Sequence, residues 1–432
     1  MKKKELVKQI VRDFHLRELP ECVPRDYVLP LTTRKIVTLT GVRRCGKTYL
    51  MYDMMQKLLN LKVKKKQLLY LNFEDERLAF TIDELEIILQ AYRELYPEQK
   101  LSDCYFFFDE IQNIKGWDKF VRRVYDSITH RIFITGSNAN LLSKEIATSL
   151  RGRTVVYEIF PLSFREYLRF MGISGDTHSS QNKAKVINHF RSFMHYGGFP
   201  EIIKENDSSV RNKILQEYFH VMLYRDMVER YQFSSTPMVK YFLHRIVDQV
   251  TKPLSVNKIF NELKSQGHRL SKNMLYDYLE AAQSVYFSLR IHKYNRSLIG
   301  RESSEKKVYI VDNGLLNALT FNFSDDYGKL LENMLFLHLR RHTEEIYFYK
   351  DIKECDFILC HRDKPQEVIQ VCYDFSSPET QKREVAGIKA ACDLMKKKQA
   401  TIITFDQEDE IRVGQIQIKI VPAYNYFLRD NK

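Results

Sequence analysis

The sequence is poor in the residues that mark non-globular or exported chains. Only 15 glycines and 11 prolines occur among its 432 residues, which excludes collagen-like and low-complexity proteins. No run approaches the roughly 18 consecutive apolar residues of a membrane span. The opening residues MKKKELVKQI also lack the apolar core of a secretory signal. We therefore expect a cytoplasmic protein.

Cysteine is present without the spacing that disulfide frameworks or zinc sites use. The seven cysteines form no C-x-x-C pair, and their number is odd. We expect reduced thiols at all seven positions, which are Cys22, Cys45, Cys104, Cys355, Cys360, Cys372 and Cys392.

Hydrophobic residues make up 44% of the chain and charged residues 28%, as in ordinary globular proteins. At roughly 100–200 residues per domain, the length suits about three domains. Sixty-eight basic residues against 55 acidic ones leave a net charge of +13. This excess suits a partner rich in phosphate, although a solvated basic surface explains it equally well.

The first third of the chain alternates short apolar runs with longer amphipathic stretches. That alternation predicts an α/β domain with a parallel sheet covered on both faces. From Phe164 to about Tyr231 the hydrophobic period becomes helical, which predicts a helical lid.

The remaining chain mixes helices and strands. We expect three short helices (238–250, 256–265, 272–282), two strands (285–291, 307–312) separated by a polar segment, and then a helix (329–342), three strands (346–351, 355–360, 367–372), a helix (380–397) and a strand (401–405).

The segment from Gly41 to Thr48 reads GVRRCGKT and matches the GxxxxGK[ST] phosphate loop between a strand and a helix. Backbone N–H groups of such a loop surround phosphate oxygens at a helix N-terminus. Lys47 is expected to reach the β- and γ-phosphates of ATP, and the Thr48 hydroxyl to bind Mg²⁺. The expected nucleotide-binding residues are Gly41, Val42, Arg43, Arg44, Cys45, Gly46, Lys47, Thr48, Tyr49, Ser137 and Asn138.

A second motif supports the first. The apolar strand YFFF ends in Asp109 and Glu110, about sixty residues after the loop. This is the Walker B arrangement, in which Asp109 would hold the magnesium through water. Glu110 would orient and polarise the water that attacks the γ-phosphate, so we expect it to be the catalytic base.

Two further segments complete the expected site. Ser137 and Asn138 follow the strand IFITG and can hydrogen-bond the γ-phosphate or the attacking water. Arg153 lies between a helix and a strand, where an arginine can project into a neighbouring subunit's site and stabilise transition-state charge. A solvated or salt-bridged arginine is the alternative.

Together these motifs resemble a large bacterial and archaeal group of AAA-type ATPases. The shared segments are GxRRxGKT, DEIQ, TGSN, LxGR, PLSFREY and YGGFPE, here Gly41–Thr48, Asp109–Gln112, Thr135–Asn138, Leu150–Arg153, Pro161–Tyr167 and Tyr196–Glu201. The resemblance implies an ATPase core (1–163), a helical lid (164–235), a winged helix (236–300) and a restriction-endonuclease-like domain (301–432).

In nucleases of that fold, carboxylates on a helix and a strand bind Mg²⁺ beside a Glu-x-Lys pair on the next strand. Glu332 and Asp356 match the carboxylates, but Gln370 and Cys372 stand where Glu-x-Lys is expected. Glu367 lies three residues too early and on the opposite side of the strand. We therefore expect a degenerate nuclease domain.

Residues 251–300 carry eight basic side chains against three acidic ones. These eight are Lys252, Lys258, Lys264, Arg269, Lys272, Arg290, Lys293 and Arg296. A recognition helix over 271–282 would place Lys272 and Asn273 toward phosphate, with Met274, Leu275, Tyr278 and Leu279 buried. The leading hypothesis is an oligomeric ATPase that couples Mg²⁺-ATP hydrolysis to a nucleic-acid or protein transaction. A signalling switch with a protein partner and an active ATP-dependent nuclease are the alternatives.

Overall fold

A computed structural model describes residues 3–138, 150–320 and 326–429 of the chain. Within these ranges the chain divides into two compact units. The first unit comprises residues 1–160 together with 284–286, and the second comprises 161–283 and 287–432. Among the described helices, none has the length and apolar character needed to cross a membrane.

The sheet of the first unit is parallel throughout, as the alternation of strands and helices predicts. Its strand order is β2-β3-β4-β1-β5. Strands β1, β3 and β4 are buried along their whole length, which explains their nearly continuous apolar sequences. The strands are β1 (Ile36–Thr40), β2 (Leu68–Asn72), β3 (Tyr105–Asp109), β4 (Ile132–Gly136) and β5 (Thr154–Glu158).

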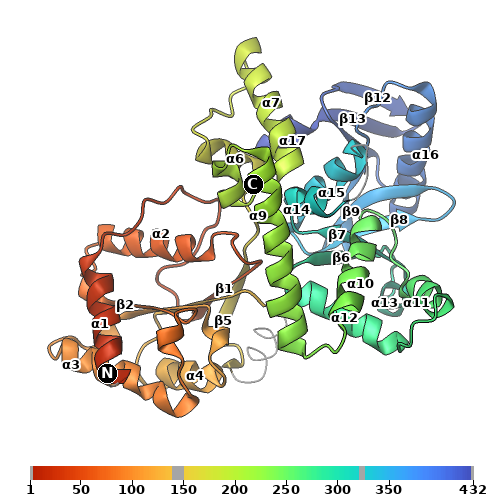
Figure 1. The fold of residues 1–432 in the computed structure, drawn as a ribbon. Helices are drawn as coiled ribbons and strands as arrows, with labels where there is room; N and C mark the ends of the chain where they lie inside the picture. The colour runs from red at the N-terminus through yellow and green to blue at the C-terminus, as the bar shows by residue number, and fades with distance from the viewer. Residues whose placement is uncertain (1–2, 139–149, 321–325, 430–432) are drawn as a thin grey trace. The chain divides into compact units, whose positions relative to one another are not determined.

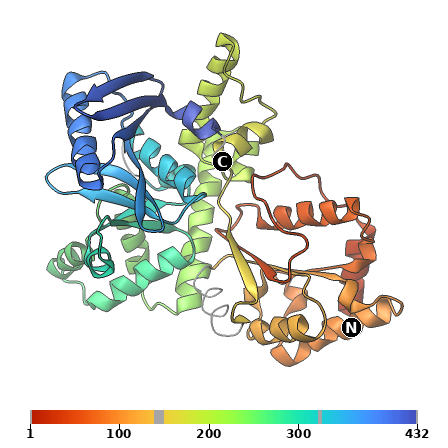
Figure 2. The ribbon, with the colours of Figure 1, turned by 180° about the vertical axis from the view of Figure 1, so that it is seen from behind.

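Helix α2 (Lys47–Asn60) covers one face of this sheet and α4 (Trp117–Ser127) the other (Figures 1 and 2). Helix α1 (Lys3–Leu16), which the sequence analysis does not predict, packs against α3 (Glu86–Leu95) and β2. Short 3₁₀ turns connect these elements: η1 (Lys65–Gln67), η2 (Glu76–Leu78), η3 (Ile82–Glu84), η4 (Leu101–Asp103) and η5 (Ile111–Asn113).

The second unit begins with helices, which agrees with the helical period after Phe164. Side chains of Ser163, Ser179 and Asp207 accept hydrogen bonds from backbone N–H groups and so cap three of these helices. The helices are α6 (Phe164–Phe170), α7 (Ser180–Tyr196), α8 (Pro200–Lys204), α9 (Ser208–Val221), the π-helix η7 (Met222–Glu229), α10 (Thr236–Asp248), α11 (Val256–Ser265) and α12 (Lys272–Ser284).

The rest of the second unit is built on a mixed sheet with the order β12-β13-β11-β10-β9-β8-β6-β7. Its strands are β6 (Ser288–Lys293), β7 (Lys306–Ile310), β8 (Ile346–Lys350), β9 (Glu354–His361), β10 (Lys364–Val371), β11 (Gln399–Thr404), β12 (Asp409–Val413) and β13 (Ile416–Pro422). The accompanying helices are α13 (Leu298–Ser303), α14 (Asn313–Leu319), α15 (Tyr327–Arg340), α16 (Pro378–Met395) and α17 (Ala423–Leu428).

Sequence analysis predicts the series α15, β8, β9, β10, α16 and β11 within a few residues but misses several other elements. Strands β12 and β13 and helices α14 and α17 carry no expectation, and α13 lies in a segment expected to be an irregular polar connection. Strand β12 is at the sheet edge and is largely exposed, so its sequence lacks the apolar signal of the central strands.

Candidate nucleotide-binding site

The phosphate loop joins the carboxyl end of β1 to the start of α2. Gly46, the residue before α2, has a φ of 99°, a conformation that glycine adopts without steric cost. At Gly41 an added Cβ would lie 2.0 Å from the carbonyl oxygen of Ile159, so only glycine fits. Arg25 donates hydrogen bonds to the carbonyl oxygens of Cys45 (3.0 Å) and Phe160 (2.9 Å) and so ties the loop to the chain after β5.

Lys47 is buried at the base of the loop. Its Nζ donates to the carbonyl oxygens of Gly41 (2.9 Å) and Val42 (3.0 Å) and lies 3.4 Å from Glu110 Oε1. Burial disfavours the charged ammonium, but Glu110, Cys45 and Asp109 together outweigh this effect and raise the pKa of Lys47. A charged lysine is therefore in place at the point where a phosphate would enter the loop.

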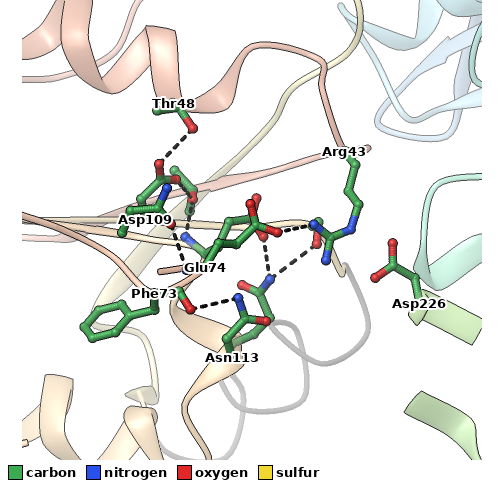
Figure 3. Close-up of polar contacts among 12 residues, drawn as sticks. Arg43, Thr48, Phe73, Glu74, Asp109, Asn113 and Asp226 are labelled. Carbon is green, nitrogen blue, oxygen red and sulfur yellow. Dashed lines mark hydrogen bonds and ion pairs between the residues drawn. The ribbon is translucent and has the colours of Figure 1, made fainter. Parts of the chain in front are cut away.

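Asp109, at the end of β3, is completely buried and accepts hydrogen bonds from three hydroxyl groups. Thr48 Oγ1 donates to Asp109 Oδ2 at 2.8 Å (Figure 3), as does the Tyr70 hydroxyl at 3.0 Å. Thr135 Oγ1 donates to the other carboxylate oxygen, Oδ1, at 2.5 Å. Burial and the neighbouring Glu110 raise the pKa of Asp109. A hydroxyl and a carboxylate 2.8 Å apart are hard oxygen donors of the kind that Mg²⁺ prefers.

Glu110 follows Asp109 in the left-handed conformation, with a φ of 49°. Its N–H donates to Thr135 Oγ1 at 2.8 Å, and its carboxylate accepts a hydrogen bond from Gln112 Nε2 at 2.5 Å. Burial opposes ionisation, but the positive charges of Lys47 and Arg43 outweigh it and lower the pKa of Glu110. Backbone strain of this kind concentrates at functional sites.

The other expected binding residues lie around this centre with different exposures. Val42 and Cys45 are buried, and burial raises the pKa of the Cys45 thiol, so that thiol is no reactive group. Tyr49 is 56% exposed. Ser137 and Asn138, after β4, are buried.

Several residues that shape the site have no role in the sequence analysis. Tyr70 and Thr135 fix Asp109, Arg25 braces the loop, and Glu74 pairs with Arg43 (Figure 3). Thr135 belongs to the TGSN motif and Gln112 to the DEIQ motif, so the sequence indicates that both lie near the site. It does not indicate which side chains they contact. The contacts of Tyr70 arise from strand pairing, because Asn72 of β2 lies in register with Asp109.

Arg153 lies at the start of β5, which runs parallel to β1. The phosphate loop follows the opposite, carboxyl end of β1, so Arg153 is remote from the loop of its own chain. Its guanidinium donates two hydrogen bonds to Asp126, at 2.8 and 3.2 Å. The structure therefore has the salt-bridged arginine that was the alternative, next to the edge strand β5.

A second buried lysine lies in the mixed sheet. Lys307 Nζ, 1% exposed, contacts Glu332 Oε1 at 3.2 Å, Glu354 Oε1 at 2.7 Å and Asp356 Oδ1 at 3.1 Å. Burial disfavours its charge, but Glu332 and Asp356 outweigh it and raise its pKa well above the ordinary value. We call Lys307, Glu332, Glu354 and Asp356 the Lys307 cluster. The structure thus brings Glu332 and Asp356 together, as expected, around a lysine that the analysis did not single out.

The two positions expected to carry Glu-x-Lys have other partners. Gln370 Oε1 accepts a hydrogen bond from the N–H of Asp356 (3.1 Å), and its Nε2 donates to Glu384 (2.7 Å). Cys372 lies in the hydrophobic core between β10 and α16, and burial raises its thiol pKa to about 12. Cys372 therefore supplies no charge to the cluster.

The expected recognition helix is α12. Leu275, Tyr278 and Leu279 are buried and Met274 is partly buried, while Lys272 is exposed and lies over the ring of Tyr276. Arg290 and Lys293 are exceptions among the basic residues, because both are partly buried, and Arg290 donates to Gln283. The exposed basic side chains of this segment are Lys252, Lys258, Lys264, Arg269, Lys272 and Arg296.

The sheet and the loop define a P-loop protein of the AAA class, and a family model described as "AAA domain" matches residues 33–168. A second model, "Domain of unknown function (DUF8612)", matches residues 187–326. The expectation of an AAA-type nucleotide-binding domain is thereby confirmed.

Two relatives are "Uncharacterized protein MJ1544" of Methanocaldococcus jannaschii and an "Uncharacterized protein" of Haemophilus influenzae. The first is 35% identical over 439 residues, 99% of this chain and 96% of that protein. The second is 31% identical over 374 residues, 86% and 88% of the two chains. The chain belongs to the same family as these two proteins. Among solved structures, AMPPCP-bound DnaA from Aquifex aeolicus aligns with 66% of this chain and 94% of its own at 13% identity, but a TM-score of 0.26 supports no further argument.

Proposed function

We propose that the chain binds ATP with Mg²⁺ at the phosphate loop and hydrolyses it to ADP and phosphate. The observation that carries the proposal is the hydrogen bond between Thr48 and Asp109, 2.8 Å long, beside the buried Lys47 and Glu110. Thr48 and Asp109 would hold Mg²⁺, which neutralises charge on the β- and γ-phosphates. Lys47 would bind the phosphates and Glu110 would accept a proton from the attacking water.

The contact between Lys47 and Glu110 links phosphate binding to base strength. The ammonium lies 3.4 Å from the carboxylate and lowers its pKa, which makes Glu110 a weak base. When phosphate oxygens attract the ammonium, this influence weakens and the pKa of Glu110 rises. Phosphate binding would thus strengthen Glu110 as a base.

Two variants test the proposal. Lys47→Ala is expected to weaken nucleotide binding, because the loop loses its cation. Glu110→Gln is expected to retain ATP but to lose hydrolysis by roughly 10²–10⁴-fold, the usual contribution of a general base. Binding of a fluorescent ATP analogue and release of phosphate measure the two effects separately. Normal hydrolysis by Glu110→Gln would show that another group is the base.

Arg153 would act on ATP bound to a neighbouring subunit of a homo-oligomer. Its pair with Asp126 is partly exposed, and exposed ion pairs are weak because water screens them, so the arginine can exchange Asp126 for a phosphate. Arg153→Ala is expected to preserve ATP affinity and lower turnover. Mixed oligomers of Arg153→Ala and Glu110→Gln chains should regain activity, whereas confirmed mixed oligomers without activity would contradict a role in trans.

The second unit would couple hydrolysis to a transaction with nucleic acid, through a winged helix (236–300) whose last helix is α12. The exposed basic residues between Lys252 and Arg296 support this proposal. Each neutralised phosphate contributes about −0.9 to the slope of log K against log salt. Replacing Lys272 and Arg296 together should therefore reduce the slope by about two.

A signalling switch with a protein partner is the second candidate for this unit, since α12 exposes the aromatic ring of Tyr276. Measuring the binding of duplex DNA at low salt distinguishes the two functions. Binding that weakens steeply between roughly 50 and 200 mM salt supports the nucleic-acid function. No binding at low salt supports the protein partner.

We propose that the restriction-endonuclease-like domain lacks nuclease activity. The Lys307 ammonium lies between the carboxylates of Glu332 and Asp356, where a catalytic cation would have to lie. Cys372 and Gln370 add no charge. An active nuclease is therefore the least favoured function.

A further inference from the structure

The side chain of Gln112 lies beside the proposed catalytic base with one polar atom unused. Its Nε2 donates to Glu110 Oε2 at 2.5 Å and to Ser137 Oγ at 3.3 Å. A carboxylate only accepts hydrogen bonds, so the amide nitrogen must face Glu110, and this fixes where the amide oxygen points. Gln112 Oε1 is buried and accepts no hydrogen bond from any residue within 3–138, 150–320 or 326–429.

A buried acceptor without a donor costs about 1–3 kcal/mol and is rare in native proteins. The oxygen therefore indicates a donor in the working site. Phosphate oxygens of ATP are acceptors and do not fit. A water molecule fits, because it carries two O–H donors.

The chain holds Gln112 firmly in this place. Glu110, with its φ of 49°, turns the chain into η5, which carries Gln112 back toward the Glu110 carboxylate. The N–H of Asn113 donates to the carbonyl oxygen of Glu110 at 3.2 Å. The Asn113 side chain also donates to the carbonyl oxygen of Phe73 at 3.2 Å (Figure 3) and anchors the turn. The amide is thus positioned before any substrate binds.

We propose that Gln112 Oε1 accepts a hydrogen bond from the water that attacks the γ-phosphate. This role rests on the proposed ATPase function. One O–H of the water points to Glu110 and the other to Gln112 Oε1, which leaves a lone pair for phosphorus. As the bond from the water oxygen to phosphorus forms, the bond from phosphorus to the bridging oxygen breaks. ADP leaves with that electron pair, and Glu110 takes the proton.

Two variants of Gln112 separate its donor from its acceptor. Gln112→Leu removes both and should lower kcat about 100-fold, a typical cost of a misplaced reactant. Affinity for fluorescent ADP and the Mg²⁺ concentration for half-maximal activity should stay within twofold, because Thr48 and Asp109 are unchanged. Gln112→Glu keeps an acceptor oxygen at this position and replaces the amide N–H donor. It should hydrolyse ATP about tenfold faster than Gln112→Leu. Gln366→Leu, at an exposed glutamine of β10, is the matched control and should equal the wild type.

Each other outcome has a definite meaning. Normal turnover by Gln112→Leu, while the wild type hydrolyses ATP, overturns the role of Gln112 and leaves the ATPase function intact. If Gln112→Glu hydrolyses ATP no faster than Gln112→Leu, the loss of turnover comes from the missing N–H donor that holds Glu110 and not from the missing acceptor. A raised Mg²⁺ requirement would make Gln112 a metal ligand instead. A wild type that binds ADP but does not hydrolyse ATP would overturn both proposals.

Discussion

Two buried lysines, each beside carboxylates, have opposite relations to their surroundings. Lys47 bonds to two backbone carbonyl oxygens and has a single carboxylate at 3.4 Å, so a phosphate can attract it away. Lys307 has three carboxylates within 3.2 Å. The comparison teaches that a buried ammonium is available to a substrate only where its charge is incompletely neutralised by the protein. Lys47 is suited to a ligand and Lys307 to holding strands together.

The stability of the two units should respond differently when these lysines are removed. Lys307→Met leaves buried carboxylates unpaired and should destabilise the second unit by about 3–5 kcal/mol. Lys47→Met removes two hydrogen bonds to carbonyl oxygens and the ion pair with Glu110, and should cost about 1–3 kcal/mol. The single tryptophan, Trp117, lies in the first unit, so its fluorescence during urea unfolding reports that unit alone. Hydrogen exchange at β9 reports the second.

A double variant sharpens the first prediction. Adding Asp356→Asn to Lys307→Met removes one of the unpaired charges and should restore part of the lost protection at β9. If the β9 amides of Lys307→Met exchange hydrogen at the same rate as those of the wild type, the Lys307 cluster does not hold the sheet together.

The two glutamates beside the lysines should give opposite pH dependences. Burial and the Asp356 carboxylate raise the pKa of Glu332 to about 8. The folded state then binds a proton that the unfolded state releases near pH 4.3, so stability falls as pH rises from about 5 to 8, by at most about 1.4 kcal/mol per pH unit. The pKa of Glu110 is lowered, so its contribution is present above about pH 4.3 and is lost in acid.

Urea unfolding at several pH values checks these signs. Glu332→Gln should abolish the decline between pH 5 and 8 in the transition of the second unit. Glu110→Gln should change only the acid side of the fluorescence transition. If the stability of Glu332→Gln still falls between pH 5 and 8, other titratable groups cause this pH dependence.

The last prediction is that the protein has no nuclease activity. With Mg²⁺ or Mn²⁺, the purified protein should not cut single- or double-stranded DNA, because Lys307 occupies the position between the carboxylates. Cleavage by the wild type that disappears in Asp356→Ala would show that the cluster admits a metal ion.

The two sites also differ in how far sequence could predict them. The phosphate loop, Asp109 and Glu110 are adjacent to buried strands in motifs with fixed spacing, and the structure brings them together as expected. In the second unit, Glu332 and Asp356 were expected to lie together, but the cation was sought at Cys372. It comes from Lys307, on a strand 49 residues before Asp356.

The elements with a local signal could be predicted from residues adjacent in the chain. Apolar runs with a period of two or 3.6 residues specify strands and helices, and glycines specify the bends of the loop, because these choices depend on neighbouring residues. Which hydroxyls fix Asp109, which residue holds Arg153, and which lysine neutralises the second pair of carboxylates became visible only in the folded chain. Such partners lie 25 to 61 residues apart, from Lys307 and Glu332 to Thr48 and Asp109. Their pairing depends on strand order and register, which a single sequence does not encode locally.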